Sequence, residues 1–105
     1  MLGEFEQVVL LAILRVGDDA YGVPVCDEIR SATGREVTLG ALYKTLARLE
    51  EKRLVRSRIG DPTPQRGGRR KRHYVVTAAG RRALQATFRT LRTLAAGLEL
   101  GLDLS

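Results

Sequence analysis

Apolar positions along this chain recur at intervals of three and four, which is the spacing of amphipathic helices. The first such stripe predicts a helix from Glu4 to Val16 and consists of Phe5, Val8, Val9, Ala12, Ile13 and Val16. A second face of the same helix is also apolar and carries Leu10, Leu11 and Leu14. A helix that is apolar on most sides is buried on most sides. In a chain of this size, we expect a second subunit to cover one of these faces.

Two further helices follow, and a short connection joins them. The second helix is predicted from about residue 22 to 32, with Pro24 in its first turn, where a missing N–H is tolerated. Gly34 stands where a C-terminal cap is expected, and Thr38 can cap a third helix that runs to about Arg53. The residues expected to face inward are Val25, Cys26 and Ile29 on the second helix, and Leu39, Leu42, Leu46 and Leu49 on the third.

Two strands and a last helix complete the pattern. Residues 54–59 and 73–76 are predicted to form a hairpin, because turn-forming residues such as Pro62 and Pro64 lie between them. Thr77 can cap a last helix, whose apolar residues step by four and three as in a helix packed against a partner: Leu84, Phe88, Leu91, Ala95, Leu98 and Leu102. The predicted fold is mainly α with a small two-stranded β wing. A winged helix-turn-helix spans residues 1–78, and a C-terminal dimerisation helix spans 79–105.

The positive charge of the chain is concentrated in one short segment of this hairpin. The formal net charge is +6 and the sequence pI is about 10.2. Residues 66–72 read Arg-Gly-Gly-Arg-Arg-Lys-Arg and carry +5, so the remaining residues carry only +1. Arginine and lysine can reach phosphates while glycine lets the backbone come close, so this wing is suited to a polyanion. A solvated charged loop is the simpler alternative.

Composition excludes several other classes of protein. A length of 105 residues fits one domain, and one cysteine cannot form an internal disulfide. The chain does not begin with a signal-peptide pattern, and its longest apolar run, residues 8–14, is far shorter than the roughly 20 residues that span a bilayer. We therefore expect a soluble cytoplasmic protein without contact to a membrane. One histidine and one cysteine make no metal site, and no catalytic set or cofactor loop is visible, so neither an enzyme nor a cofactor is expected.

Several motifs in this order resemble the PadR-like transcriptional regulators. They are Tyr21-Gly22, Thr33-Gly34, the segment Leu39-Gly40-Ala41-Leu42-Tyr43-Lys44-Thr45-Leu46, Arg48-Leu49-Glu50, Leu54-Val55, residues 66–74, and Thr77-Ala78-Ala79-Gly80. The resemblance covers about residues 5–84. It implies a homodimeric DNA-binding protein, usually a repressor, whose third helix enters the major groove and whose wing touches the backbone or minor groove. It also implies that the terminal helices form the dimer.

Two residues depart from the family pattern, and one partner is left open. Arg53 stands where the family usually has Gly; a positive φ there would strain Arg by roughly 1 kcal/mol. Ala41 stands where the family often has Thr, so one polar contact of the recognition helix is absent. Some members of the family release DNA on binding small aromatic or drug-like molecules. A chain this short either lacks a pocket for such an effector or forms one between subunits.

The candidate site residues follow from these patterns. For DNA binding they are Thr38, Ala41, Tyr43, Lys44, Thr45 and Arg48 on the third helix, and Arg69, Arg70, Lys71 and Arg72 in the wing. Tyr43 can equally be buried beside its leucine neighbours. For dimerisation they are Phe5, Leu10, Leu14, Leu84, Phe88, Leu91, Ala95 and Leu98. A non-specific nucleic-acid binder and a protein-interaction module are the competing functions.

Overall fold

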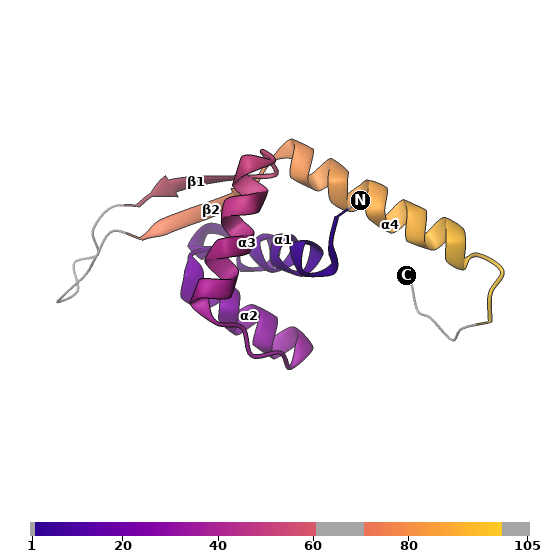
Figure 1. The fold of residues 1–105 in the computed structure, drawn as a ribbon, viewed down its shortest axis with the longest axis horizontal. Coiled ribbons are helices and arrows are strands. Elements are labelled where there is room, and N and C mark those ends of the chain that lie inside the picture. Colours follow the sequence, from indigo (N-terminus) through magenta and orange to yellow (C-terminus); the bar gives the residue numbers. More distant parts are fainter. Residues whose placement is uncertain (1, 61–70, 100–105) are drawn as a thin grey trace.

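The computed structural model describes residues 2–60 and 71–99. Along the chain lie α1 (Glu4–Val16), the 3-10 turn η1 (Gly17–Asp19), α2 (Gly22–Thr33), α3 (Leu39–Glu51), β1 (Val55–Ile59), β2 (Arg72–Val76) and α4 (Ala78–Ala95). The predicted elements are all present, with ends displaced by one or two residues. The strands project from one end of the helical body, and α4 extends from it in the opposite direction (Figure 1). The predicted fold class, mainly α with a two-stranded wing, is confirmed.

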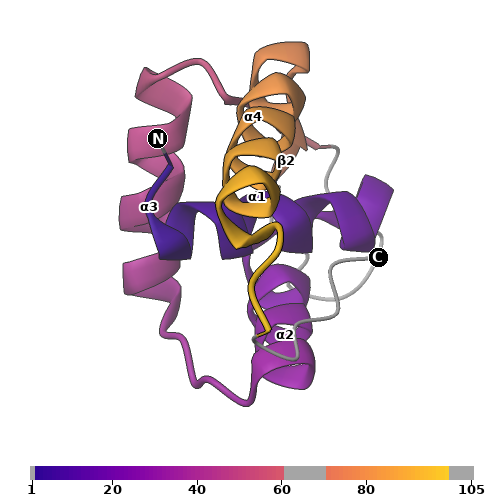
Figure 2. The same ribbon diagram turned by 90° about the vertical axis from the view of Figure 1, so that its right-hand side faces the viewer.

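The core forms around α1, which the other elements surround. Its residues Val9, Leu10 and Ile13 are buried against side chains of α2, α3, the strands and α4. Figure 2, viewed nearly along α4, shows α1 crossing beneath that helix with α3 to one side. The apolar faces of α1 are thus covered largely by other elements of the same chain. Leu10 was predicted as a dimer contact, but this is wrong, because its side chain is 0% exposed in the single chain.

Leu84 requires the same correction. It is 4% exposed and belongs to the core, because it is the residue by which the first half of α4 packs on the body. Leu39, predicted in the buried stripe of α3, is 42% exposed, since it lies at the helix start beyond the reach of α1. Ile59 is on the same face of β1 as Val55, but it lies too far along the wing to reach the core and is exposed.

The chain leaves α3 through a left-handed residue. Arg53 has φ 63°. The N–H of Leu54 donates to the carbonyl of Leu49 at 2.9 Å, and the N–H of Arg53 donates to the carbonyl of Glu50 at 2.9 Å. These two bonds are those of a Schellman motif, whose left-handed position normally carries Gly. The strain expected at Arg53 is therefore present.

Replacing Arg53 with Gly is expected to raise the free energy of unfolding by about 0.5–1 kcal/mol, because the left-handed conformation is unfavourable for L-residues with a Cβ. The side chain is exposed, so little contact is lost. Chemical denaturation measures the change. Glu51→Gly, at an exposed helical position, should do the opposite and lower stability by about 1 kcal/mol. Equal destabilisation by both substitutions would contradict the strain.

The wing is a regular antiparallel hairpin tied to the helical body. Val55 pairs with Val76 and Ile59 with Arg72, and the N–H of Tyr74 donates to the carbonyl of Ala20 at 2.8 Å. That bond holds the outer edge of β2 against the end of η1. The root of the wing is therefore fixed relative to α2 and α3.

The start of α4 is fastened to the start of β1. The Thr77 hydroxyl donates to the carbonyl of Arg53 at 2.8 Å and accepts from the N–H of Gly80 at 3.0 Å, so it caps α4 and joins it to the preceding turn. The N–H of Thr77 donates to the carbonyl of Leu54 at 3.0 Å.

Within the described parts of the chain, no helix is long and apolar enough to cross a membrane.

A partly buried ion pair connects the end of α3 to the first turn of α1. The Lys52 Nζ lies 2.8 Å from a carboxylate oxygen of Glu6, whose other oxygen accepts from the N–H of Gly3 at 3.0 Å. Glu6 is 7% exposed. The hydrogen bond from Lys52 is the largest effect on its pKa and outweighs the opposing effect of burial, so the pKa of Glu6 lies below its ordinary value of 4.5.

Replacing Glu6 with Gln, which keeps an acceptor for Gly3, is expected to destabilise the fold by about 1–2 kcal/mol near neutral pH. A lowered folded-state pKa stabilises above pH 4.5, and this contribution is lost as the pH falls through the folded-state value. The difference between wild type and variant should therefore shrink below pH 4.5, as measured by denaturation at several pH values. Glu28→Gln removes an exposed pair with Arg15 and serves as the control, with an expected change of roughly 0.5 kcal/mol or less.

Candidate nucleic-acid interface

The exposed side of α3 forms a ridge of small and cationic residues, which ends at the exposed, acidic Glu51 in the last turn. Leu42, Thr45, Leu46 and Leu49 face the core, which leaves Gly40, Lys44 and Ala47 pointing outward. Thr45 is only 7% exposed, so its predicted role as a base contact is wrong for this conformation. Its position between the core leucines explains the burial, because residues three and four apart share a helix face.

The two flanks of this ridge have different neighbours. Ala41 and Arg48 lie on the flank toward Lys52 and α1, where Arg48 contributes to the lowered pKa of Glu6. Tyr43 and Glu50 lie on the flank toward the wing. The predicted recognition face was thus centred on the flank away from the wing, whereas the outward ridge and Tyr43 stand nearer to it.

Tyr43 is exposed and packs by its edge against α2. It is 44% exposed, and a Cβ added at Gly22 would overlap its hydroxyl group. Gly22 therefore permits α2 and the Tyr43 ring to approach closely. Tyr43 is therefore not a core residue in the free chain, and its hydroxyl group packs against Gly22 at the start of α2.

An open groove connects α3 to the distal part of the wing. It is lined by Tyr21, Val23, Leu39, Tyr43, Lys71, Arg72 and Tyr74. The residues come from α2 and its approach, from α3 and from β2, so side chains of the third helix and of the basic segment face one space.

Lys71, just beyond the distal end of the paired strands, is held against an aromatic ring of the body. Its Nζ lies 4.2 Å from the centroid of the Tyr21 ring, a cation–π contact. His73 packs edge-on to the same ring at 5.5 Å, and its Nδ1 lies 3.2 Å from the carbonyl oxygen of Asp18. His73 was predicted as an ordinary strand residue, and Tyr21 was noted only as part of the Tyr21-Gly22 motif and not as a site residue.

Arg72 is joined to α3 through one serine. Its guanidinium donates to the hydroxyl of Ser57 at 3.0 Å, and that hydroxyl donates to a carboxylate oxygen of Glu50 at 2.5 Å. This chain of hydrogen bonds sets the spacing between the last turn of α3 and the wing. No sequence motif indicated it, because the three residues come together only through the register of the hairpin. Arg69 and Arg70, also part of the predicted site, lie outside the described residues.

The predicted dimer residues occupy several environments. Phe5 and Leu14 are half-buried against the core, and the guanidinium of Arg35 lies 5.4 Å from the centroid of the Phe5 ring. In the second half of α4 and just beyond it, Phe88, Leu91 and Leu98 are 38%, 43% and 58% exposed, while Ala95 is half-buried. Leu94, which the four-three spacing passed over, is the most exposed at 70%.

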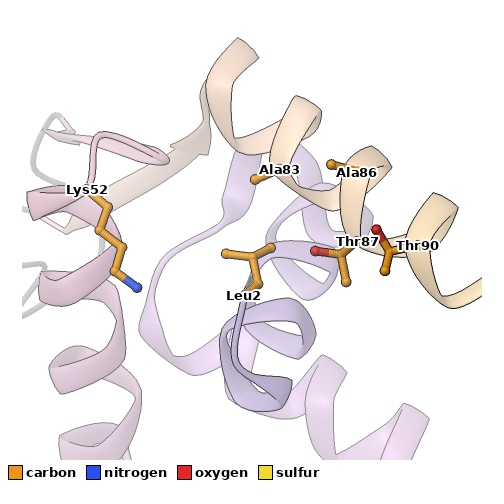
Figure 3. A pocket seen from close by; sticks show the side chains of 6 residues that line it. All are labelled: Leu2, Lys52, Ala83, Ala86, Thr87 and Thr90. Atoms are coloured by element: carbon orange, nitrogen blue, oxygen red, sulfur yellow. The ribbon is translucent and has the colours of Figure 1, made fainter.

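A cavity of about 460 Å³ lies between α4 and the chain's N-terminal segment. Figure 3 shows the side chains that line it: Leu2, Lys52, Ala83, Ala86, Thr87 and Thr90. Its lining is apolar apart from two hydroxyls and the Lys52 ammonium. Among the described residues, no cluster of three histidine, cysteine or acidic side chains could hold a metal ion. Burial raises the pKa of the Cys26 thiol, which disfavours a nucleophilic thiolate.

Several solved structures have a similar fold. A transcriptional regulator from Clostridium thermocellum is 22% identical, with a TM-score of 0.69, and the match covers 86% of this chain and 84% of that one. A PadR family transcription regulator from Clostridium difficile is 26% identical, with a TM-score of 0.66, covering 87% and 94%. A winged-helix DNA-binding protein from STIV is 14% identical, with a TM-score of 0.67, covering 92% and 97%.

No curated protein sequence matches the chain. The family model described as "Transcriptional regulator PadR-like family" matches residues 10–86, which include the helix-turn-helix, the wing and the first half of α4. The chain therefore belongs to the PadR-like family of transcriptional regulators and has the winged-helix, DNA-binding fold of that family.

Proposed function

We propose that this protein is a sequence-specific repressor that binds a pseudo-palindromic operator as a homodimer. The observation that carries the proposal is the groove in which Tyr43 of α3 and Lys71 and Arg72 of the wing face one space. A duplex lying along the α3 ridge would meet both elements at once. In this proposal, Lys44 and Arg48 reach base edges or phosphates in the major groove, while Arg69, Arg70, Lys71 and Arg72 contact the backbone or the minor groove.

The exposed N-terminal turn of α3 supports this orientation. The Thr38 hydroxyl accepts from the N–H of Ala41 at 3.1 Å, which leaves the N–H groups of Leu39 and Gly40 directed outward at the positive end of the helix dipole. Such a helix end holds phosphate well. Ala41 beside it provides only a methyl group, which suits an apolar contact with a thymine methyl.

The dimer is proposed from the apolar surface of α4. Leu91, Leu94 and Leu98 are 43%, 70% and 58% exposed. They lie on or just after the half of α4 that extends from the body (Figure 1), and an exposed apolar patch marks an interaction site. Pairing of two such helices would place two α3 ridges against half-sites about one helical turn, roughly 34–36 Å, apart. Sedimentation should give a dimer at micromolar concentration, and a variant with Leu91→Gln and Leu94→Gln should sediment as a monomer.

Selection of genomic fragments by the purified protein, followed by sequencing, tests the function itself. One enriched palindrome, with random duplexes bound much more weakly, is the expected result. Equal binding of all fragments would indicate a non-specific binder, and no binding at low salt would indicate a protein-interaction module. Either outcome would overturn the proposal.

Gly40 provides a test of the α3 assignment that separates folding from binding. A Cβ at this position would meet nothing within 4 Å, so packing within the chain does not require the glycine. Gly40→Ala should therefore stabilise the fold by about 1 kcal/mol through helix propensity. If the backbone there approaches the duplex, the same substitution should weaken binding to the selected fragment. Binding that remains unchanged in a stabilised variant would place the duplex elsewhere.

A further inference from the structure

Four arginines form a stripe along one side of α4. Arg81, Arg82, Arg89 and Arg92 are all exposed. With successive residues turned by about 100°, all four fall within an arc of roughly 100° around the helix. The stripe extends about 16 Å along the axis from Arg81 to Arg92, at 1.5 Å per residue. The helix contains no aspartate or glutamate from Ala78 to Ala95.

Some exposed cations of the chain pair with carboxylates, whereas others, such as Lys44, Arg56 and Arg58, take part in none of the ion pairs found among the described residues. Arg15, Arg30 and Arg35 each pair with a carboxylate, at 3.3, 3.1 and 2.6 Å. None of the ion pairs found among residues 2–60 and 71–99 includes an arginine of α4. A solvated face normally mixes charges of both signs, and like charges three residues apart, such as Arg89 and Arg92, repel one another slightly. The stripe is better explained if an anion lies across it.

The stripe faces away from the recognition helix. Ala83, Ala86, Thr87 and Thr90 line the cavity toward Lys52, at the end of α3 (Figure 3). The arginines occupy another side of α4 from this cavity, because the centre of their arc is rotated by roughly 140° around the helix from the centre of those four positions. Leu84 and Thr87 bury a further side of the helix against the body. A duplex bound on the α3 ridge of the same chain therefore does not reach the stripe.

The chemistry of the stripe fits the phosphates of duplex DNA. Guanidinium groups bind phosphate in a bidentate manner, and a duplex carries a negative charge about every 1.7 Å of its axis, so a straight row of cations can follow it. A membrane surface fits less well, because the first half of α4 is fixed to the body and cannot lie with one face in lipid. We infer that the arginine stripe of α4 is a second, sequence-independent DNA-binding surface, which lets one dimer join two duplex segments.

This inference rests on the proposed function for the first duplex, and the test keeps the two apart. An immobilised fragment from the genomic selection is saturated with protein and washed, and a labelled duplex of random sequence is then added. The wild-type protein is expected to capture the second duplex, with binding that weakens steeply as salt increases. The variant Arg82→Gln, Arg89→Gln, Arg92→Gln should lower this capture by roughly tenfold or more and reduce the log–log salt slope by about 2.7.

The control variant Arg15→Gln, Arg30→Gln, Arg35→Gln removes the same charge from paired surface sites and should leave capture of the second duplex close to wild type. Binding to the immobilised fragment should be unchanged in both variants. If the wild type does not bind that fragment, the proposed function fails. If it binds the fragment but captures no second duplex, or if the stripe variant captures it as well as the control does, the inference fails. Recovery of an acidic protein by the stripe in place of DNA would also overturn it.

Discussion

Replacing Arg69, Arg70 and Arg72 with alanine is expected to weaken binding to the operator on the order of a hundredfold near physiological salt. Each phosphate contact releases counterions when it forms, so its loss reduces the log–log slope of affinity against salt by about 0.9, or about 2.7 for all three. Fluorescence anisotropy over a range of salt concentrations measures both quantities. A variant that keeps the wild-type slope would show that the wing does not contact phosphates.

Arg72 is expected to contribute less to binding than a full phosphate contact, because it already has a hydrogen-bond partner in the free chain. In the free chain its guanidinium donates to Ser57, which donates to Glu50, so binding a phosphate requires Arg72 either to leave this arrangement or to share it. The single substitution Arg72→Ala should therefore cost less affinity than the loss of one full phosphate contact, because part of the interaction of Arg72 already exists before DNA arrives. Arg15→Gln, Arg30→Gln, Arg35→Gln again provides the control for net charge, with an expected slope close to wild type.

The order and type of the elements could be predicted because local signals agreed along the chain. Thr38 and Thr77 accept from the N–H groups three residues on, as caps do, and Gly34 ends α2 in a left-handed conformation. The strain at Arg53 could also be predicted. The family usually has glycine at this position after the helix, and a glycine there indicates a positive φ.

The faces of the helices were harder to predict than the helices themselves. Leu10 and Leu11 are adjacent apolar residues, yet one is wholly buried and the other is 37% exposed. Periodicity shows that α1 has more than one apolar face, but only the arrangement of α2, α3 and α4 around it decides which of them is covered within the chain. The same argument applies to Thr45. Its polar side chain led to the prediction that it faces DNA, but the packing of the core buries it.

Contacts between distant segments could not be predicted at all. The hydrogen bonds from Arg72 to Ser57 and from Ser57 to Glu50 depend on the register of β1 and β2, and a shift of one residue would point Ser57 to the other face of the sheet. The groove beside α3 depends on the same register. The basic segment was visible in the sequence, whereas the side chains that hold its root in place were not.

Replacing Gly80 with alanine is expected to destabilise the fold by about 2–3 kcal/mol, although alanine is the better helix former. A Cβ at this position would overlap the carbonyl oxygen of Leu54 and lie 2.7 Å from Cγ1 of Val76. The overlapping atom belongs to the backbone, and the same carbonyl accepts from Thr77, so it cannot simply move aside. Relief of the overlap requires α4 to shift away from the first residues of β1. Thermal unfolding should show a Tm lowered by roughly 10 °C or more.

Gly40→Ala is the matched control, because it makes the same chemical change inside a helix where the added methyl meets nothing within 4 Å. It should raise the free energy of unfolding while Gly80→Ala lowers it, and the opposite signs would separate close packing from helix propensity. A shift of α4 at Gly80 also changes the angle at which the exposed leucines leave the body, so the proposed dimer should weaken together with the fold. If Gly80→Ala proved as stable as Gly40→Ala, the close approach of α4 to β1 would not exist in solution, and the fixed position of α4 beside the wing would have to be abandoned.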